Sequence, residues 1–191
     1  MGTVEEDDAN FLCELAQGHT YAIELGTFTG QFSAAILKGL NPDGRLLTLD
    51  TFRGSSGGSI TQSLTQLQQL KALFERLTPY EGRYTVMVGE FSQAAHWIAN
   101  ASVDFVFIDG AHDYASVISD ISLFYPKLKI GGSVMVGHDF AQPASKCDPV
   151  KLARYSTSDD PYEGLHYGVI RAVSELFPKC EHRNRFWWVH L

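Results

Sequence analysis

The stretch Tyr21-Ala-Ile-Glu-Leu-Gly-Thr-Phe-Thr-Gly30 leads an apolar strand directly into a turn bounded by two glycines. Residues 31–40, which follow, place their apolar side chains at helical spacing. A strand, a tight turn and a helix form the opening unit of a parallel α/β sheet. The turn lacks the third glycine of the dinucleotide-binding fingerprint, and it lacks the Gly-Lys-Ser/Thr of a phosphate-binding loop.

Predicted strands and helices continue to alternate to the end of the chain. Further strands are predicted at 45–50, 84–88, 103–108, 133–137 and 186–191, and helices at 9–17, 31–40, 60–77, 91–99, 114–128 and 164–177. We therefore expect one α/β domain over residues 1–191, with a three-layer, doubly wound and mostly parallel sheet of six or seven strands and an antiparallel C-terminal strand. Residues 1–19 form an acidic segment with a short helix. Residues 51–60 and 141–163 are candidate lid loops, the second with three prolines and no clear periodicity.

Composition narrows the class of protein. Of 191 residues, 45% are hydrophobic and 19% charged, which is typical of a globular domain and excludes a disordered or fibrous chain. Apolar runs are too short to span a bilayer, and the first residues are acidic where a signal peptide is basic and apolar. A net charge of −7 with dispersed Lys and Arg argues against nucleic acid as a partner. Three distant cysteines indicate reduced thiols. We expect a cytoplasmic protein, with a homodimer as the default assembly.

Most of the predicted strands deliver a carboxylate to the same edge of the sheet. The residues at or just past these strand ends are Glu24, Asp50, Glu90, Asp109 and Asp139. In open parallel sheets, ligands bind outside the carboxyl ends of the strands. This rim is therefore the expected site of chemistry.

One end of the rim has the pattern of a nucleoside site. Gly26 and Gly30 permit a tight turn around Thr27, and Asp50 follows 20 residues later, where a carboxylate can accept both hydroxyl protons of a ribose. Glu24 would repel a pyrophosphate and attract an ammonium group. The pattern therefore predicts a ligand that has a ribose and an ammonium group but no phosphates, and S-adenosylmethionine is such a ligand. Glu90 and Ser92 are candidates for the adenine amino group. The alternatives are a rim salt bridge for Glu24, plain turn chemistry for the glycines and helix capping for Glu90 and Ser92.

The other end of the rim joins carboxylates to histidines. Asp109 and Asp139 end neighbouring strands and could share Mg²⁺ or Mn²⁺, with His138 as a third ligand candidate or a residue on the substrate side. His112 is the candidate base, or else only a neighbour of a helix N-cap. His19, His96, His166, His182 and His190 are expected to be ordinary surface or packing histidines. Trp187 and Trp188 must face opposite sides of their strand.

The segments Glu24–Gly30, Phe107-Ile-Asp-Gly-Ala-His-Asp-Tyr114 and Gly137-His-Asp-Phe140 resemble, in this order, class I S-adenosylmethionine-dependent methyltransferases. The likeness covers about residues 20–191. It is greatest to the small metal-dependent O-methyltransferases of the macrocin/mycinamicin and cephalosporin-biosynthesis type. The resemblance implies a cofactor site at Glu24, Gly26, Gly30 and Asp50, a divalent metal on Asp109 and Asp139, and His112 as base.

The sequence leaves three other functions open. In a metal-free methyltransferase, Asp109 and His112 would act only as base and orienter. A non-catalytic protein would bind the cofactor without methylating any acceptor, and the aromatic C-terminal segment would serve as its interface. An NAD-dependent oxidoreductase is disfavoured by the missing glycine. The acceptor is expected to be a small-molecule hydroxyl, for example on a sugar or glycan, but the predicted lid loops carry no pattern that identifies it.

Overall fold

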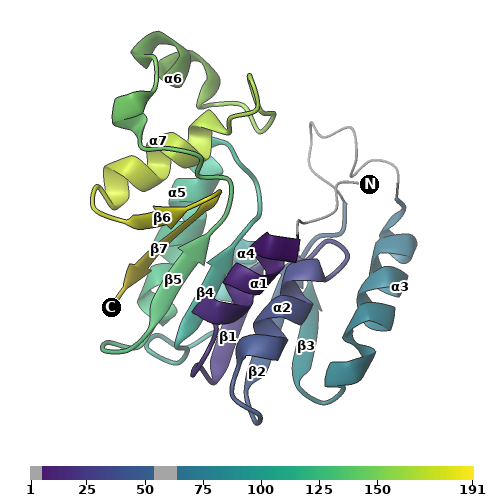
Figure 1. Ribbon diagram of the computed structural model, residues 1–191. Coiled ribbons are helices and arrows are strands. Elements are labelled where there is room, and N and C mark those ends of the chain that lie inside the picture. Colours follow the sequence, from purple (N-terminus) through teal and green to yellow (C-terminus); the bar gives the residue numbers. More distant parts are fainter. Residues whose placement is uncertain (1–5, 54–63) are drawn as a thin grey trace.

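A computed structural model describes residues 6–53 and 64–191, and in this part of the chain seven strands form one mixed sheet (Figure 1). Their order is β3-β2-β1-β4-β5-β7-β6. The strands are β1 (Tyr21–Leu25), β2 (Arg45–Asp50), β3 (Tyr84–Val88), β4 (Phe105–Ile108), β5 (Val134–Gly137), β6 (Glu181–Arg183) and β7 (Phe186–His190). β1 to β5 pair in parallel, and β7 is antiparallel to both of its neighbours. The predicted doubly wound α/β fold is confirmed.

The strand order reverses between β1 and β4. From β1 the chain moves outward through β2 to β3, and it then returns to place β4 on the other side of β1. Leu25 is in register with Leu49 of β2 on one side and Ile108 of β4 on the other. Ligands of open α/β sheets bind at such a switch point, outside the strand ends. The segments that follow β1 and β4 therefore form the floor of the site.

Two apolar clusters hold helices against the two faces of the sheet. One cluster joins the sheet to α1 (Glu6–Leu15), α2 (Gln31–Gly39) and α3 (Gln66–Leu77), and the other joins it to α4 (Phe91–Ala95), α5 (Tyr114–Phe124) and α7 (Tyr167–Leu176). All four residues of β4 are buried, in agreement with the prediction of a strand covered on both faces. Short 3₁₀ turns extend two of the helices, at Thr78–Tyr80 after α3 and at Tyr125–Lys127 after α5.

The predicted loop at 141–163 is wrong in part, because it contains a 3₁₀ turn at Ala144–Lys146 and the helix α6 (Pro149–Tyr155). Asp148 caps this helix by accepting the backbone N–H groups of Val150 and Lys151, and Pro149 occupies its first position. Both are standard helix-start signals. Figure 1 shows α6 above the sheet, apart from the two helical layers.

The helix predicted at 60–77 begins at Gln66, and Thr65 and Gln68 form a capping box at its N-terminus. Residues 54–63, which include most of the candidate lid loop at 51–60, lie outside the described residues, as do residues 1–5.

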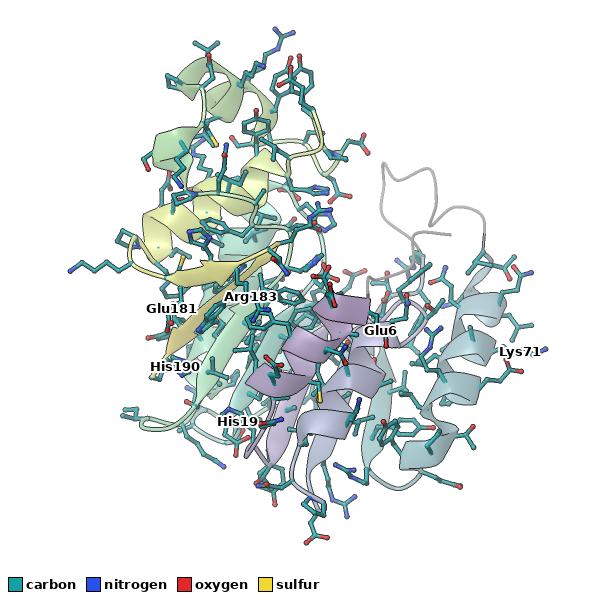
Figure 2. All side chains as sticks on the ribbon, in the orientation of Figure 1. Glu6, His19, Lys71, Glu181, Arg183 and His190 are labelled. Carbon is teal, nitrogen blue, oxygen red and sulfur yellow. The ribbon has the colours of Figure 1, made fainter. Side chains whose placement is uncertain are left out.

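The C-terminal strands close one edge of the sheet. β6 is a strand that the sequence did not predict, and Figure 2 shows its Glu181 near His190 of β7, with 3.7 Å between Oε1 and Nε2. Trp187 is buried in the cluster of α5 and α7, whereas Trp188 packs against the cluster of α1, so the two indoles face opposite sides as predicted. The three cysteines are unpaired. Within the described residues, no helix is long and apolar enough to cross a membrane.

Candidate active site

A cavity of about 860 Å³ opens above the ends of β1, β2 and β4. This volume lies in the range of pockets that bind small molecules and cofactors. Among the described residues, the lining contains no lysine or arginine, but it contains six carboxylates, those of Asp50, Glu90, Asp109, Asp120, Asp139 and Asp159. Such a lining favours a ligand with positive charge and disfavours one that carries phosphates.

The turn after β1 forms one wall and depends on its glycines. Gly26 has φ +92°, and a Cβ at this position would lie 1.9 Å from the backbone oxygen of Asp109. Gly30 has φ +77° and stands at the N-cap of α2, where it offers no side chain to the first turn. That first turn also carries no acidic residue. Its backbone N–H groups therefore suit the carboxylate of a ligand.

Asp50 ends β2 and organises this turn. Its Oδ2 accepts the backbone N–H groups of Thr27 (2.9 Å) and Phe28 (2.8 Å), and its Oδ1 accepts that of Phe52 (2.7 Å). The carboxylate lines the cavity. Its two oxygens offer about four acceptor positions, and these N–H groups use three of them, so Oδ1 keeps one for a ligand. Asp50, the predicted ribose residue, therefore lies in the cavity wall, and it also fixes the turn after β1.

Glu24 lies below the cavity floor rather than in its lining. The side chain is fully buried, and its Oε2 accepts hydrogen bonds from Ser33 and from Thr48 (2.5 Å). Thr48 in turn contacts the Thr27 hydroxyl, so a buried polar row connects Glu24 to the turn. Burial, only partly offset by these hydrogen bonds, raises the pKa of Glu24 to about 8. Its Oε1 is buried and has no partner among the described residues.

Glu90 and Ser92 lie at the outer wall, where α4 begins. Both line the cavity and are exposed. Glu90 stands at the N-cap position of α4 but makes no capping hydrogen bond with its side chain, and its Oε1 lies 3.6 Å from Nη1 of Arg53. The capping alternative for Glu90 is therefore wrong. The side chain is available to a ligand at the cavity entrance.

The structure brings His112 and both predicted metal ligands together. His112 Nε2 lies 3.0 Å from Oδ2 of Asp139 and 3.9 Å from Oδ1 of Asp109. Burial alone would lower the pKa of His112, but the carboxylates of Asp109, Asp139 and Asp159 outweigh it and raise the pKa to about 12. Burial alone would raise the pKa of Asp139, but the imidazoles of His112 and His138 outweigh it and hold that pKa far below its usual value. With these partners alone, the three carboxylates favour the protonated form of His112.

His138 lies at the opposite side of Asp139. Its Nδ1 is 3.6 Å from Oδ1 of Asp139 and 3.7 Å from Oδ1 of Asp109, so the three predicted metal-site residues do form a cluster. Its Nε2 lies 3.9 Å from a carboxylate oxygen of Asp8, which belongs to α1. The acidic N-terminal segment therefore contributes a side chain next to the site, and no motif in the sequence indicates this.

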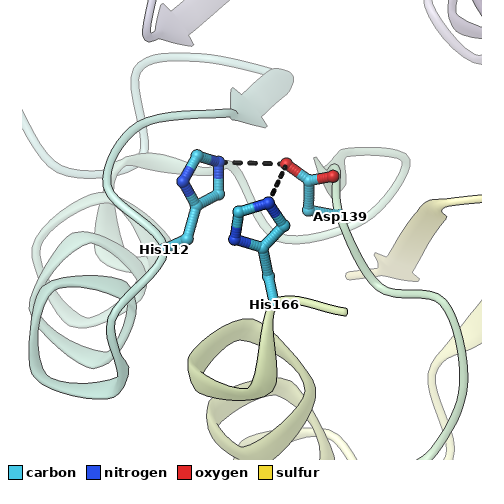
Figure 3. Close-up of side chains that lie close together, drawn as sticks. All are labelled: His112, Asp139 and His166. Carbon is cyan, nitrogen blue, oxygen red and sulfur yellow. Dashed lines mark ion pairs between the residues drawn. The ribbon is translucent and has the colours of Figure 1, made fainter. Parts of the chain in front are cut away.

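Three further side chains complete the cluster and were missed. His166, expected to be an ordinary histidine, is buried at the start of α7, and its Nε2 lies 3.9 Å from Oδ2 of Asp139 (Figure 3). Asp159, from the segment predicted as a lid, accepts the backbone N–H of His112. Arg185 places Nη2 2.5 Å from Oδ1 of Asp139. No motif marks these residues, because they come from the segments around α6, α7 and β7 and meet only in the folded chain.

Asp120 of α5 is a fourth missed residue. It is 7% exposed and lines the cavity. Burial, with a smaller contribution from Asp113, raises the pKa of its carboxyl to about 7 from an ordinary value of 3.8. The folded state thus keeps a proton that the unfolded chain releases between about pH 4 and 7. Stability must fall across this interval as the pH rises.

Asp120→Asn should remove this pH dependence. At pH 8 we expect the variant to exceed the wild type in free energy of unfolding by up to about 4 kcal/mol, because about three pKa units are involved. At pH 4.5, where the unfolded chain has already released most of this proton, the difference should shrink to about 1 kcal/mol. Urea unfolding at both pH values measures the difference, with Asp160→Asn, an exposed aspartate, as the control. An equal difference at both pH values would contradict the burial of an ionisable group here.

The comparisons with known proteins agree with this geometry. The sequence model of a methyltransferase-domain family matches residues 23–140. Among solved structures, a protein from Corynebacterium glutamicum superposes with a TM-score of 0.68 at 18% identity, covering 98% of this chain and 82% of its own. The O-methyltransferase TomG from Streptomyces achromogenes, involved in tomaymycin synthesis and solved with S-adenosylmethionine, gives 0.63 at 19% identity over 97% and 80%. An O-methyltransferase from Bacillus cereus, solved with S-adenosylhomocysteine, gives 0.62 at 16% over 97% and 80%. No curated protein matches significantly.

Proposed function

The chain belongs to the methyltransferase-domain family, and we propose that it transfers a methyl group from S-adenosylmethionine to a hydroxyl group of a small molecule. The observation that carries this proposal is the charge of the cavity. Six acidic side chains, one of them Asp120 with its pKa raised to about 7, and no lysine or arginine line it among the described residues. A sulfonium nucleoside with an ammonium group suits this lining, whereas NAD, ATP or coenzyme A would bring phosphates against carboxylates.

The residues present fit this cofactor at several points. The uncapped first turn of α2 suits its carboxylate, and Asp50 can accept hydrogen bonds from its ribose. Glu90 and Ser92 at the outer wall are the candidates for the adenine amino group. Two solved relatives of the same fold are named as complexes with S-adenosylmethionine or S-adenosylhomocysteine. When bound, the cofactor supplies an electrophilic methyl group on a sulfonium sulfur.

The acceptor end of the cavity is the cluster around Asp139. Asp109 and Asp139 could hold a divalent cation there, and the ion would make an acceptor hydroxyl more acidic. His112 and Asp159 would orient that hydroxyl or move its proton. The resemblance to the macrocin/mycinamicin and cephalosporin-biosynthesis type favours a sugar or glycan hydroxyl. Solved structures of the same fold include O-methyltransferases of other substrate classes. The acceptor is therefore best identified by testing a panel of candidate hydroxyl compounds.

Calorimetry with S-adenosylhomocysteine tests the proposed cofactor. We expect a dissociation constant in the micromolar range, roughly −8 kcal/mol of binding free energy, because the site is largely formed in the free protein. ATP and NADH are the matched controls, since each carries a nucleoside together with phosphates, and neither should bind measurably. Tight binding of NADH without binding of S-adenosylhomocysteine would overturn the proposal and restore the oxidoreductase alternative.

Transfer of a labelled methyl group to an acceptor tests the reaction itself. The panel should contain sugars, catechols and hydroxycinnamates. Labelled product with any of them excludes the non-catalytic alternative. Unchanged turnover in the presence of a chelator would support the metal-free reaction, in which Asp109 and His112 act without an ion.

A further inference from the structure

The two carboxylate oxygens of Asp139 have different surroundings. Oδ1 faces Arg185, whose Nη2 lies 2.5 Å away, and His138, whose Nδ1 lies 3.6 Å away. Oδ2 faces two imidazole nitrogens, Nε2 of His112 at 3.0 Å and Nε2 of His166 at 3.9 Å. Arg185 already places a positive charge against Oδ1. A cation that binds this carboxylate therefore has its more favourable position at Oδ2.

We propose that Asp139 Oδ2, His112 Nε2 and His166 Nε2 together bind a divalent transition-metal ion, such as Zn²⁺, Mn²⁺, Fe²⁺ or Co²⁺. The three ligand atoms lie within 4.8 Å of one another (Figure 3). Metal–ligand bonds of about 2.1 Å require ligand atoms roughly 3 to 4 Å apart, so small side-chain movements suffice. The site rests on the proposed function for its role and deepens it: His112 and His166 replace Asp109 as ligands of the ion at the acceptor end of the cavity, and His112 is then a ligand and not the group that moves the proton.

The surroundings of His112 are those of a metal-binding histidine. Its Nδ1 lies 3.2 Å from Oδ1 of Asp159, and the same oxygen accepts the backbone N–H of His112 at 2.6 Å. Histidine ligands of metals commonly donate their second ring N–H to a carboxylate, which fixes the tautomer and aims the other nitrogen at the ion. Asp159 therefore prepares Nε2 of His112 as a ligand.

His166 provides an independent observation. The centroids of the His112 and His166 rings are 4.1 Å apart, and both rings approach the same oxygen of Asp139. Two imidazole nitrogens directed at one carboxylate oxygen are the arrangement in which two histidines and an aspartate share one ion. In addition, Nδ1 of His166 is buried and has no partner among the described residues. Because no hydrogen bond within the described residues fixes Nδ1, the ring can turn its Nε2 toward an ion at Oδ2 of Asp139.

The donor set selects the class of ion. Mg²⁺ prefers an octahedron of oxygen ligands, whereas two imidazoles and one carboxylate favour Zn²⁺ and its first-row neighbours. Three protein ligands also leave coordination positions open for an acceptor oxygen. The competing set is Asp109, His138 and Asp139, which has two carboxylates and one imidazole. In this competing set the ion would have to bind Oδ1 of Asp139, which already forms an ion pair with Arg185.

Metal titration of the full-length protein after chelator treatment and dialysis tests the assignment. We expect Co²⁺ and Zn²⁺ to bind at least about 100-fold more tightly than Mg²⁺ in calorimetry, and bound Co²⁺ to show the visible absorption bands of a site with nitrogen ligands. His166→Ala should lower the affinity for Co²⁺ by at least about 100-fold and Asp159→Asn by about 10-fold. His182→Ala, on the exposed strand β6, should leave it unchanged, and His138→Ala, which removes only a neighbour of Oδ1 of Asp139, should lower it far less than His166→Ala.

Three outcomes would overturn the proposal. The first is equal affinity for Mg²⁺ and Co²⁺. The second is a loss of affinity in His138→Ala but not in His166→Ala, which would assign the ion to the competing set. The third is no metal binding at all. Thermal unfolding of each variant verifies that it is folded. Calorimetry with S-adenosylhomocysteine on the same metal-free samples tests the proposed function separately, because the nucleoside site at Asp50 lies at the other end of the cavity.

Discussion

Replacing Gly26 with alanine should lower the free energy of unfolding by at least about 3 kcal/mol and abolish binding of S-adenosylhomocysteine. The new Cβ would lie 1.9 Å from the backbone oxygen and 2.6 Å from the carbonyl carbon of Asp109, and neither atom can rotate away. The ends of β1 and β4 would have to separate. These strand ends are held together by the hydrogen bond from Asp109 N to Leu25 O at 2.8 Å. Urea unfolding and calorimetry measure the two effects.

Gly18→Ala is the matched control for this experiment. Gly18 also has a positive φ, +81°, but no atom lies within 4 Å of the position of its Cβ. It therefore reports only the backbone strain of an alanine in the left-handed region, about 1 kcal/mol. Equal losses of stability in the two variants would show that the close approach of β1 and β4 at the switch point is not what requires glycine at position 26.

Asp50→Ala should weaken the binding of S-adenosylhomocysteine by about 100-fold, which corresponds to about 2.7 kcal/mol. The substitution removes the acceptor for the ribose hydroxyls, and it also leaves the backbone N–H groups of Thr27, Phe28 and Phe52 without their carboxylate. Hydrogen bonds to a charged group contribute about 1.5–3 kcal/mol each. We therefore expect a loss of stability as well, since the turn after β1 is no longer fixed.

Asp148→Ala separates these two effects. Asp148 also accepts two backbone N–H groups, those of Val150 and Lys151, but at the start of α6 and outside the cavity lining. This variant should lose stability, about 1 kcal/mol, and keep its affinity for S-adenosylhomocysteine. Asp50→Asn, which retains one acceptor oxygen, should bind with intermediate affinity. Unaltered affinity in Asp50→Ala would contradict a nucleoside site at the end of β2.

Most elements of the fold could be predicted because their signals are local. β3 has the predicted bounds, 84–88, and α2 ends one residue before its predicted end. Hydrophobic periodicity marks such elements because each buries one face or one stripe against the sheet. α6 was missed although Asp148 and Pro149 signal its start, because a helix of seven residues is too short to show periodicity. β6 has three exposed residues and no pattern of its own, so only its pairing with β7 makes it a strand.

The residues of the site also fall into two groups, those that the sequence predicts and those that only the folded structure brings to the cluster. Gly26, Asp50, Asp109 and Asp139 follow directly from the sequence, because the carboxyl ends of parallel strands meet at one edge. His166, Asp159 and Arg185 do not, since they lie outside the β–α units and reach the cluster through the packing of α7 and of the segments after α6 and β6.

The role of Asp139 depends both on its place in the sequence and on the structure around it. Its position at the end of β5 is a property of the chain, but its φ of +60° and the division of its two oxygens between Arg185 and the imidazoles are set by the surrounding structure. The sequence by itself determined the class of sheet and the acidic rim, because these depend on short-range periodicity and on the fixed direction of parallel strands. Only the tertiary structure decided which histidines share a carboxylate and which acid is buried, because long-range packing sets the distances and the desolvation on which electrostatic interactions depend.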